Sequence, residues 1–374
     1  MTPPARTAAR AKSRPTWRRH AAGTLAALLA GAVLAGVTLE ATVLLLVGEQ
    51  PRFPRHVVGS HFGLRINEPG AHYRHRSADI DVDFRINRQG MRAGYDFTYA
   101  KPAGTLRIVS LGDSFTIGYE VAEDETFSSV LERELRERGF AVEVLNAGVS
   151  GYSNAEELLY LERELLRYDP DLVLVSFSAN DLVDNIRSGL FLLEDGSLVE
   201  ASTGYVPGGL LGDWLNTNPL LGWLSEHSNG FAFLKERLTL LVKQRVVDAN
   251  VQNVETATAP LEASGPSLEE RLTAAIFERL YRATRERGIP LVIQSIPIPA
   301  PLSDPHALLD LFPLDAFDVR RAGIVFFPAL SVLEPELGQT LLYHRRSHGH
   351  WTPAAHRRAG EALARLVAGE LRSE

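Results

Sequence analysis

Apolar and polar positions along the chain follow two repeats that together predict an α/β domain. From residue 105 onward, short and almost continuous apolar runs are separated by longer stretches with the helical repeat. The apolar runs are LRIVSL (106–111), AVEVLN (141–146), DLVLVSF (171–177), PLVIQSI (290–296) and, more weakly, GIVFF (323–327). The helical stretches lie near 124–138, 154–167, 268–287 and 353–371. Such alternation is typical of a parallel sheet covered on both faces, so we expect a three-layer α/β domain with a five-stranded parallel sheet over residues 104–374.

The N-terminal pattern is different, because residues 21–47 form one long apolar segment with a single charge, Glu40. About 20 apolar residues span a bilayer, and this segment is longer than the apolar core of a typical signal peptide. Residues 1–20 are basic and contain no acid, which by the positive-inside rule places them in the cytoplasm. We therefore expect a basic cytoplasmic tail (1–20), a transmembrane anchor (21–47) and a body outside the cytoplasm, in the periplasm or at the cell surface. A cleaved signal peptide stays open as the alternative, because small residues are frequent in the segment.

Two further segments depart from the main repeat. Residues 48–103 form a polar connector in which DIDVDFRIN (79–87) alternates like a half-buried strand and NRQGMR (87–92) supplies a turn, so we expect a small β-rich lead-in. Residues 187–266 interrupt the strand–helix rhythm as an insertion between the third and fourth strands, with one helix around 230–246. The insertion also has an aromatic patch, which we interpret as its own core or as a wall or lid of the active site: Trp214, Trp223, Phe231 and Phe233.

Composition narrows the classes of protein to consider. The chain has no cysteine, which excludes a disulfide framework, a thiolate metal site and a cysteine nucleophile. The net charge is −7 although the first 20 residues are strongly basic, so the body is acidic. An acidic body argues against nucleic acid as a partner.

Reactive side chains follow several of the predicted strands at the point where each strand ends. GDSFTIG with Ser114 follows the first strand, NAGVSGYS with Gly151 the second, SAND with Asn180 the third and SHGHW with His350 the last. Carboxyl ends of parallel strands meet at one edge of an open sheet, where such folds bind ligands. A hydroxyl, a base and amide donors are the groups that serine acyl chemistry requires.

These four blocks, in this order, resemble the SGNH (GDSL-type) hydrolase superfamily. The resemblance covers roughly residues 104–371, and INRQGMR before RIVSLGDSF is similar to membrane-anchored bacterial members of uncertain substrate. It implies a flavodoxin-like sheet, and the lack of G-x-S-x-G disfavours the nucleophile elbow of the α/β-hydrolases. It also implies that no metal or organic cofactor is needed.

The resemblance assigns a role to each matching residue. Ser114 is the expected nucleophile and its backbone N–H part of the oxyanion hole, which the Gly151 N–H and the Asn180 side-chain amide complete. His350 is the expected general base and then acid. Asp113 is expected to brace the nucleophile loop.

Each of these residues also has a structural interpretation. Ser114 or Asn180 could simply cap a helix, and Gly151 could only permit a tight turn. Three neighbours of the motif residues are interpreted as structural: Gly148, Asp181 and His356.

The sequence departs from the family pattern at the acid that should orient His350. Ser347 and His348 occupy the two positions where an Asp is expected. Three hypotheses remain open. The first is a Ser–His dyad with Ser347 or a backbone carbonyl holding the ring. The second is a carboxylate from elsewhere, with Asp304 and Glu334 as candidates by position, and the third is a site that binds ligand without turnover.

A metal site is a weaker alternative. It would use the histidine cluster near the C-terminus, which suits zinc but leaves Ser114 unexplained: His344, His348, His350 and His356. The sequence therefore predicts a membrane-anchored serine esterase acting on an acylated carbohydrate or lipid. An O-acyltransferase to an envelope polysaccharide and a catalytically silent carbohydrate- or lipid-binding module stay open.

Overall fold

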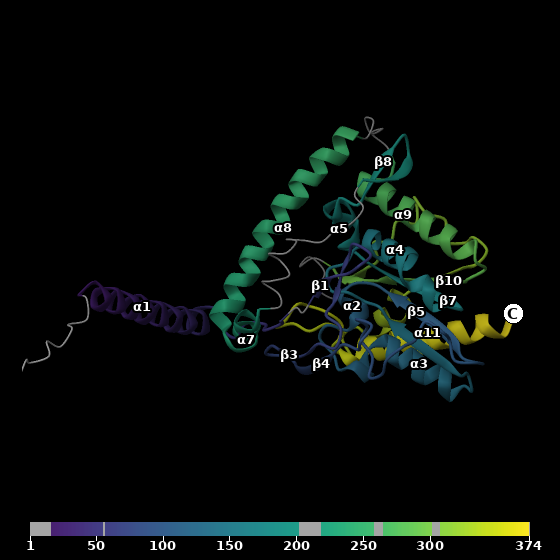
Figure 1. Ribbon diagram of the computed structural model, residues 1–374. Helices are drawn as coiled ribbons and strands as arrows, with labels where there is room; N and C mark the ends of the chain where they lie inside the picture. Colours follow the sequence, from purple (N-terminus) through teal and green to yellow (C-terminus); the bar gives the residue numbers. More distant parts are fainter. Residues whose placement is uncertain (1–15, 55–56, 202–217, 258–264, 301–306, 374) are drawn as a thin grey trace, which may run out of the picture.

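A central parallel sheet organises the body of the protein. The computed structural model describes residues 16–54, 57–201, 218–257, 265–300 and 307–373 (Figure 1). The sheet has the order β13-β10-β7-β5-β6, with all neighbours parallel. Its strands are β5 (Leu106–Leu111), β6 (Val142–Asn146), β7 (Leu172–Ser178), β10 (Leu291–Ile296) and β13 (Ile324–Pro328). Numbered along the chain, this is the flavodoxin-like order, so the predicted fold class and all five predicted strands are confirmed.

Helices cover both faces of the sheet because successive strand residues point to opposite sides. Ile108 and Leu174 belong to the core under α3 (Phe127–Glu137) and α11 (Pro353–Ser373). Val109 and Val173 belong to the core under the helices of the other face. Those helices are α4 (Asn154–Arg163), α5 (Asp181–Ser188) and α9 (Leu268–Arg285). The result is three layers, helix–sheet–helix.

Short elements connect these layers. They are α2 (Ser114–Ile117), α10 (Leu330–Leu333), the strand pair β11 (Ile298–Pro299) and β12 (Leu308–Leu309), and the 3₁₀ helices η1 (Glu123–Glu125), η2 (Leu165–Tyr168) and η3 (Glu334–Glu336).

The segment before the sheet forms two small antiparallel hairpins. One pairs β1 (Val57–Gly59) with β2 (Arg65–Asn67), and the other pairs β3 (His72–Arg76) with β4 (Asp81–Arg85). Phe53, Tyr73 and Phe84 form a small apolar cluster with Ile117 and Tyr119, which follow the nucleophile. The lead-in is thereby packed against the loop next to the active site.

The N-terminal apolar segment and the insertion form helices that meet. Helix α1 (Thr16–Leu46) extends away from the body, and its stretch His20–Leu46 is long and apolar enough to cross a membrane (Figure 1). The insertion contributes the hairpin of β8 (Phe191–Glu194) and β9 (Ser197–Glu200), then α7 (Pro219–His227) and α8 (Asn229–Ala257). Helix α8 is longer than the predicted 230–246 and crosses the side of the body from which α1 emerges. Of the predicted aromatic patch, Trp223 is exposed and Trp214 lies outside the described residues.

Candidate active site

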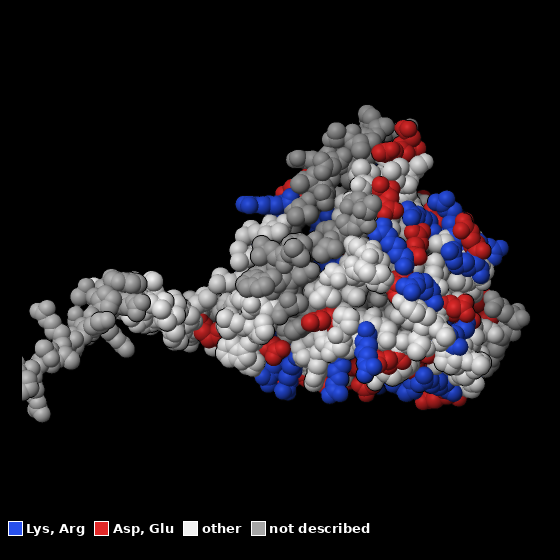
Figure 2. Space-filling model, in the orientation of Figure 1, with Lys and Arg blue, Asp and Glu red and all other residues white. Residues whose placement is uncertain are grey.

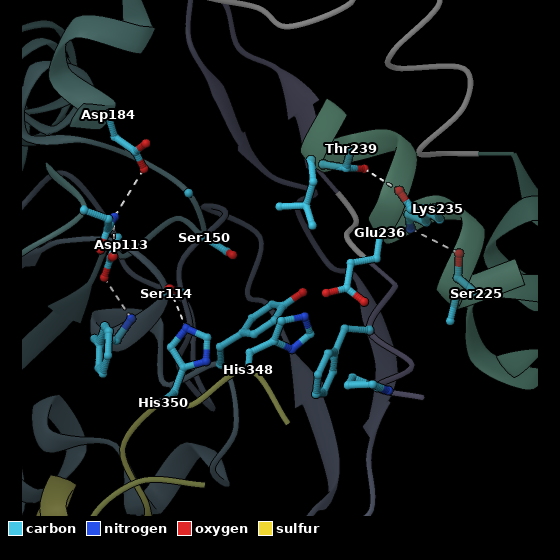
Figure 3. Close-up of a pocket in the computed structure, with 18 of the residues that line it drawn as sticks. Asp113, Ser114, Ser150, Asp184, Ser225, Lys235, Glu236, Thr239, His348 and His350 are labelled. Atoms are coloured by element: carbon cyan, nitrogen blue, oxygen red, sulfur yellow. Dashed lines mark hydrogen bonds between the residues drawn. The ribbon is translucent and has the colours of Figure 1, made fainter. Parts of the chain in front are cut away.

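The nucleophile candidate Ser114 lies at the first position of α2, directly beyond the carboxyl end of β5. The turn before it needs glycine at position 112, where φ is +157° and a Cβ would lie 1.9 Å from the Thr116 hydroxyl oxygen. Asp113 precedes the helix and accepts a hydrogen bond of 2.9 Å from the Phe115 N–H. This turn holds the Ser114 hydroxyl at the cleft (Figure 3).

His350 and Ser114 are brought together although they are far apart in sequence. The Nε2 atom of His350 lies 2.7 Å from the Ser114 Oγ. The rings of Phe115 and Tyr119 meet the His350 ring edge-on, with centroids at 4.9 Å and 5.6 Å. Figure 3 shows the His350 ring directed at the serine. A base at this distance can accept the hydroxyl proton.

A carboxylate outside the predicted set of site residues, Glu120, lies behind His350. One oxygen of Glu120 accepts the His350 backbone N–H at 3.1 Å and lies 3.4 Å from His350 Nδ1. The other oxygen accepts the His348 N–H at 2.8 Å and the Ser347 hydroxyl. The side chain of Glu120 is fully buried. Ser347 therefore orients Glu120 instead of the His350 ring, which differs from the first hypothesis for this position.

The environment of Glu120 keeps it charged. Burial alone would raise its pKa, but hydrogen bonds from His348, His350 and Ser347, together with the charge of His350, hold the pKa well below the usual value. A buried carboxylate next to Nδ1 is placed to stabilise an imidazolium at this position. At 3.4 Å the Nδ1 atom contacts the Glu120 carboxylate without forming a hydrogen bond, and contacts of catalytic groups often tighten only when substrate binds.

The two acids considered earlier for this role do not supply the carboxylate in the described structure. Glu334 is exposed on η3, and Asp304 lies outside the described residues. A signal for Glu120 does exist in the sequence, since it is a single acid within the otherwise uncharged run TIGYEVA. Its neighbours Tyr119 and Val121 are buried.

The lead-in holds the loop that carries Glu120. Arg92, which ends NRQGMR, is buried and donates to the carbonyls of Ile117 at 2.7 Å, of Gly118, and of Val121 at 2.6 Å. His75 of β3 lies 2.8 Å through Nδ1 from the Tyr119 carbonyl, and burial lowers its pKa to about 3. Glu120 thus sits in a loop whose carbonyls are fixed on both sides.

The expected oxyanion donors face the same cleft. Gly151 has φ of +78°, a conformation that favours glycine, and its carbonyl accepts hydrogen bonds from Arg65 and Arg187. The Asn180 Nδ2 atom lies 3.4 Å from Asp113 Oδ2 and 3.2 Å from Asp184 Oδ2. Asn180 follows β7 and Ser114 follows β5, so the two flank the crevice between these neighbouring strands, where flavodoxin-like folds bind ligands.

The three neighbours interpreted as structural take part in packing. His356 is buried, and its Nδ1 accepts the Phe127 N–H at 3.2 Å. A Cβ at Gly148 would lie 2.4 Å from the Ile117 nitrogen. Asp181 is buried and accepts the Ser178 N–H at 2.8 Å, and burial raises its pKa well above the usual value. Among the residues that the structure describes, no three His, Cys, Asp or Glu side chains form a group that could hold a metal ion.

The cleft is bounded by parts of three segments and has a volume of about 550 Å³. The sheet edge contributes Ser114, Gly151 and Asn180, and the lead-in contributes Phe53. The opposite wall is helix α8 with Lys235 and its neighbours (Figure 3). The insertion therefore forms a wall of the cleft.

Residues 110–358 match the family model of the GDSL-like lipase/acylhydrolase family. The chain belongs to this family. Family membership supports ester hydrolysis as the chemistry of the cleft, in agreement with the resemblance seen in the sequence.

Individual proteins match this chain only over a short stretch or at low sequence identity. An arylesterase of Vibrio mimicus is 36% identical over 75 residues, which is 20% of this chain and 38% of that protein. Among solved structures, an esterase of Pseudoalteromonas sp. is 13% identical with a TM-score of 0.38, over 71% of this chain and 98% of the other. A two-domain esterase active on acetylated mannans is 15% identical with a TM-score of 0.35, over 73% of this chain and 51% of the other.

Proposed function

We propose that the protein is a serine-dependent ester hydrolase that acts outside the cytoplasm, through an acyl-serine intermediate, on an acylated carbohydrate or lipid. The observation that carries the proposal is the 2.7 Å distance between His350 Nε2 and Ser114 Oγ, with Glu120 behind the ring. This arrangement favours turnover over a silent binding module, because both the base and its carboxylate are in place.

Ser114, His350 and Glu120 act together in the acylation step. Ser114 Oγ attacks the ester carbonyl while its proton passes to His350 Nε2, and Glu120 stabilises the resulting imidazolium. The backbone N–H groups of Ser114 and Gly151 and the amide of Asn180 stabilise the oxyanion. The His350 proton then goes to the leaving alkoxide, and the acyl group stays on Ser114.

The second step releases the acyl group. His350 takes a proton from water, the hydroxide attacks the acyl carbonyl, and the proton returns to Ser114 Oγ. A sugar hydroxyl could replace water without any change in these residues, which is the O-acyltransferase alternative.

The location rests on helix α1, which we propose is an uncleaved anchor with its N-terminus in the cytoplasm. Val43 of α1 is buried at 3% exposure. The Glu40 carboxylate accepts hydrogen bonds from Ser228, Asn229 and Gly230. Because the end of α1 is part of the folded body, these contacts favour an anchor over a cleaved signal peptide.

Replacement of the nucleophile tests the enzymatic proposal. Ser114→Ala should abolish labelling by a serine-reactive phosphonate and lower the hydrolysis of short nitrophenyl esters by about 10³-fold or more. Both are measured on the purified full-length protein. Ser331→Ala, an exposed serine bonded to its own turn, is the matched control and should keep full activity. Equal labelling of wild type and Ser114→Ala would refute the proposal.

A further inference from the structure

The junction of α1 and α8 fixes where α8 begins relative to a membrane. Helix α1 rises about 30 Å from His20 to Glu40 at about 1.5 Å per residue, which is the thickness of the hydrocarbon core of a bilayer, and its apolar stretch continues six residues further, to Leu46. Glu40 caps the start of α8 through Ser228 Oγ at 2.7 Å and the Gly230 N–H at 2.8 Å. If α1 spans the membrane, α8 therefore starts at its outer surface.

Helix α8 presents one side to the cleft and another side away from it. The side toward the cleft carries Lys235, Glu236 and Thr239 together with Ala232 and Leu240. The opposite face carries Leu234, Leu238 and Leu241, spaced four and three residues apart and exposed at 44%, 61% and 63%. A helix of a soluble protein normally turns its large apolar side chains to the core, and here these three leucines point away from it.

Neighbouring side chains extend the exposed apolar surface and suit a lipid interface. Leu220 and Trp223 of α7 are exposed at 64% and 55%. Arg237 and Arg245 are exposed beside the leucine row, from where long basic side chains reach lipid phosphates. Trp is enriched at membrane interfaces. Figure 2 shows charged side chains of both signs over much of the body. The described part of α1 that projects from the body is white, which marks uncharged residues.

We infer that the outward face of the α7–α8 hairpin docks on the outer leaflet of the membrane that α1 spans. We define this face by Leu220, Trp223, Leu234, Leu238 and Leu241. The inference rests on the proposed anchor. We assign the bilayer as the partner of this face because the face adjoins α1 at the depth where the hydrocarbon core ends. Docking holds the catalytic cleft, whose far wall is α8, beside the lipid headgroups.

Single-cysteine labelling of the full chain in vesicles tests the docking. The chain has no native cysteine, so Leu238→Cys, Leu241→Cys and Thr239→Cys each give one site for a nitrobenzoxadiazole fluorophore. The vesicles contain phosphatidylethanolamine and phosphatidylglycerol with a doxyl-labelled lipid whose spin label lies near the headgroups. We expect the labels at 238 and 241 to emit at shorter wavelength and to be quenched. The label at 239, on the cleft face, should show neither effect.

Two controls test the proposed anchor and the proposed enzymatic activity separately from the docking. Val33→Cys in α1, where Val33 is 67% exposed, reports insertion of the anchor with a doxyl group deep in the acyl chain. Phosphonate labelling of Ser114 in the same vesicles reports the folded active site and tests the enzymatic proposal separately.

Four outcomes decide the question. Quenching at 238 and 241 but not at 239 supports docking. Unquenched labels at 238 and 241 beside a quenched label at 33 overturn it, and short-wavelength emission without quenching overturns it in favour of a protein partner or a second copy. An unquenched label at 33 contradicts both the proposed anchor and the docking. The esterase proposal is unaffected by that result if the phosphonate still labels Ser114.

Discussion

At the scale of single residues, the main finding is the source of the carboxylate behind His350. Family members resembling this chain carry an Asp just before the histidine, whereas here Glu120 follows the nucleophile. The Ser347 hydroxyl and the His348 N–H both donate to Glu120. The two positions where the family pattern has the acid thus donate hydrogen bonds to Glu120.

Replacement of Glu120 by its amide tests this assignment. Glu120→Gln removes the charge that stabilises the His350 imidazolium, so kcat should fall by roughly 10²–10⁴-fold while KM changes little. Steady-state kinetics with a nitrophenyl ester measure both values. Asp124→Asn, on the exposed side of the next turn, should behave as wild type. An unchanged kcat in Glu120→Gln would restore the dyad hypothesis.

The pH dependence of stability gives a second readout of the same change. The folded-state pKa of Glu120 lies below its usual value, so the ionised group stabilises the fold above its unfolded pKa of about 4.3. That contribution decreases progressively as pH falls from about 4.3 toward the much lower folded-state pKa. The difference in free energy of unfolding between wild type and Glu120→Gln should therefore shrink on acidification, as urea titrations at several pH values would measure. A difference that does not vary with pH would contradict this explanation.

At the scale of elements, the lead-in is a support for the active site. Its NRQGMR turn delivers Arg92, whose guanidinium holds the carbonyls on both sides of Glu120 and lies over the Phe84 ring at 3.8 Å. Asn67 of β2 donates to the Gly148 carbonyl at 3.0 Å, next to the loop of Gly151. The lead-in therefore fixes two of the loops that form the cleft.

Arg92 should act on catalysis through position. Arg92→Met leaves three buried carbonyls without their donor, which should cost about 2–4 kcal/mol of stability and lower kcat more than it changes KM. Arg92→Lys keeps the charge but not the fork of donors, so its kcat should be intermediate. Melting curves and steady-state kinetics measure the two effects. The exposed Arg88 of the same turn provides the control Arg88→Met, and equal kinetics in the Arg92 and Arg88 variants would argue against a positioning role.

At the scale of the whole molecule, the insertion links the proposed anchor to the cleft. Gly230 permits close contact with α1, because a Cβ there would lie 2.9 Å from the Leu39 Cγ. The backbone N–H of Gln50 donates to Asn229 Oδ1 at 2.9 Å. The start of α8 is thus fixed to the end of α1, and α8 in turn contacts α5 beside Asn180.

Loss of this link should loosen the wall of the cleft. Glu40→Gln removes an acceptor of hydrogen bonds from Ser228, Asn229 and Gly230, which should cost about 1–3 kcal/mol locally. About 1.4 kcal/mol is a tenfold change in the open population, so trypsin should cut vesicle-bound protein within α8 roughly tenfold faster. Glu49→Gln, at an exposed ion pair with Arg52, is the control. Equal cleavage rates would show that Glu40 does not hold the hairpin.

Local patterns in the amino-acid sequence sufficed to predict the strands and the sheet edge where the motif residues lie. Apolar runs and helical repeats are local properties, so they located all five strands of the sheet. Because the strands are parallel, the residues that follow them lie at one edge, and Ser114, Asn180 and His350 could be assigned to the same cleft.

Long-range packing places Glu120 beside His350 and makes the insertion a wall of the cleft, and neither could be predicted from local patterns. Glu120 and His350 are 230 positions apart, and the intervening chain has no repeat or motif that ties them. Their contact depends on how the loop after α2 packs between Arg92 and the SHGHW turn. The direction of the two faces of α8 likewise depends on its contact with α1, because a helical repeat specifies that two faces exist and packing alone specifies where each one points.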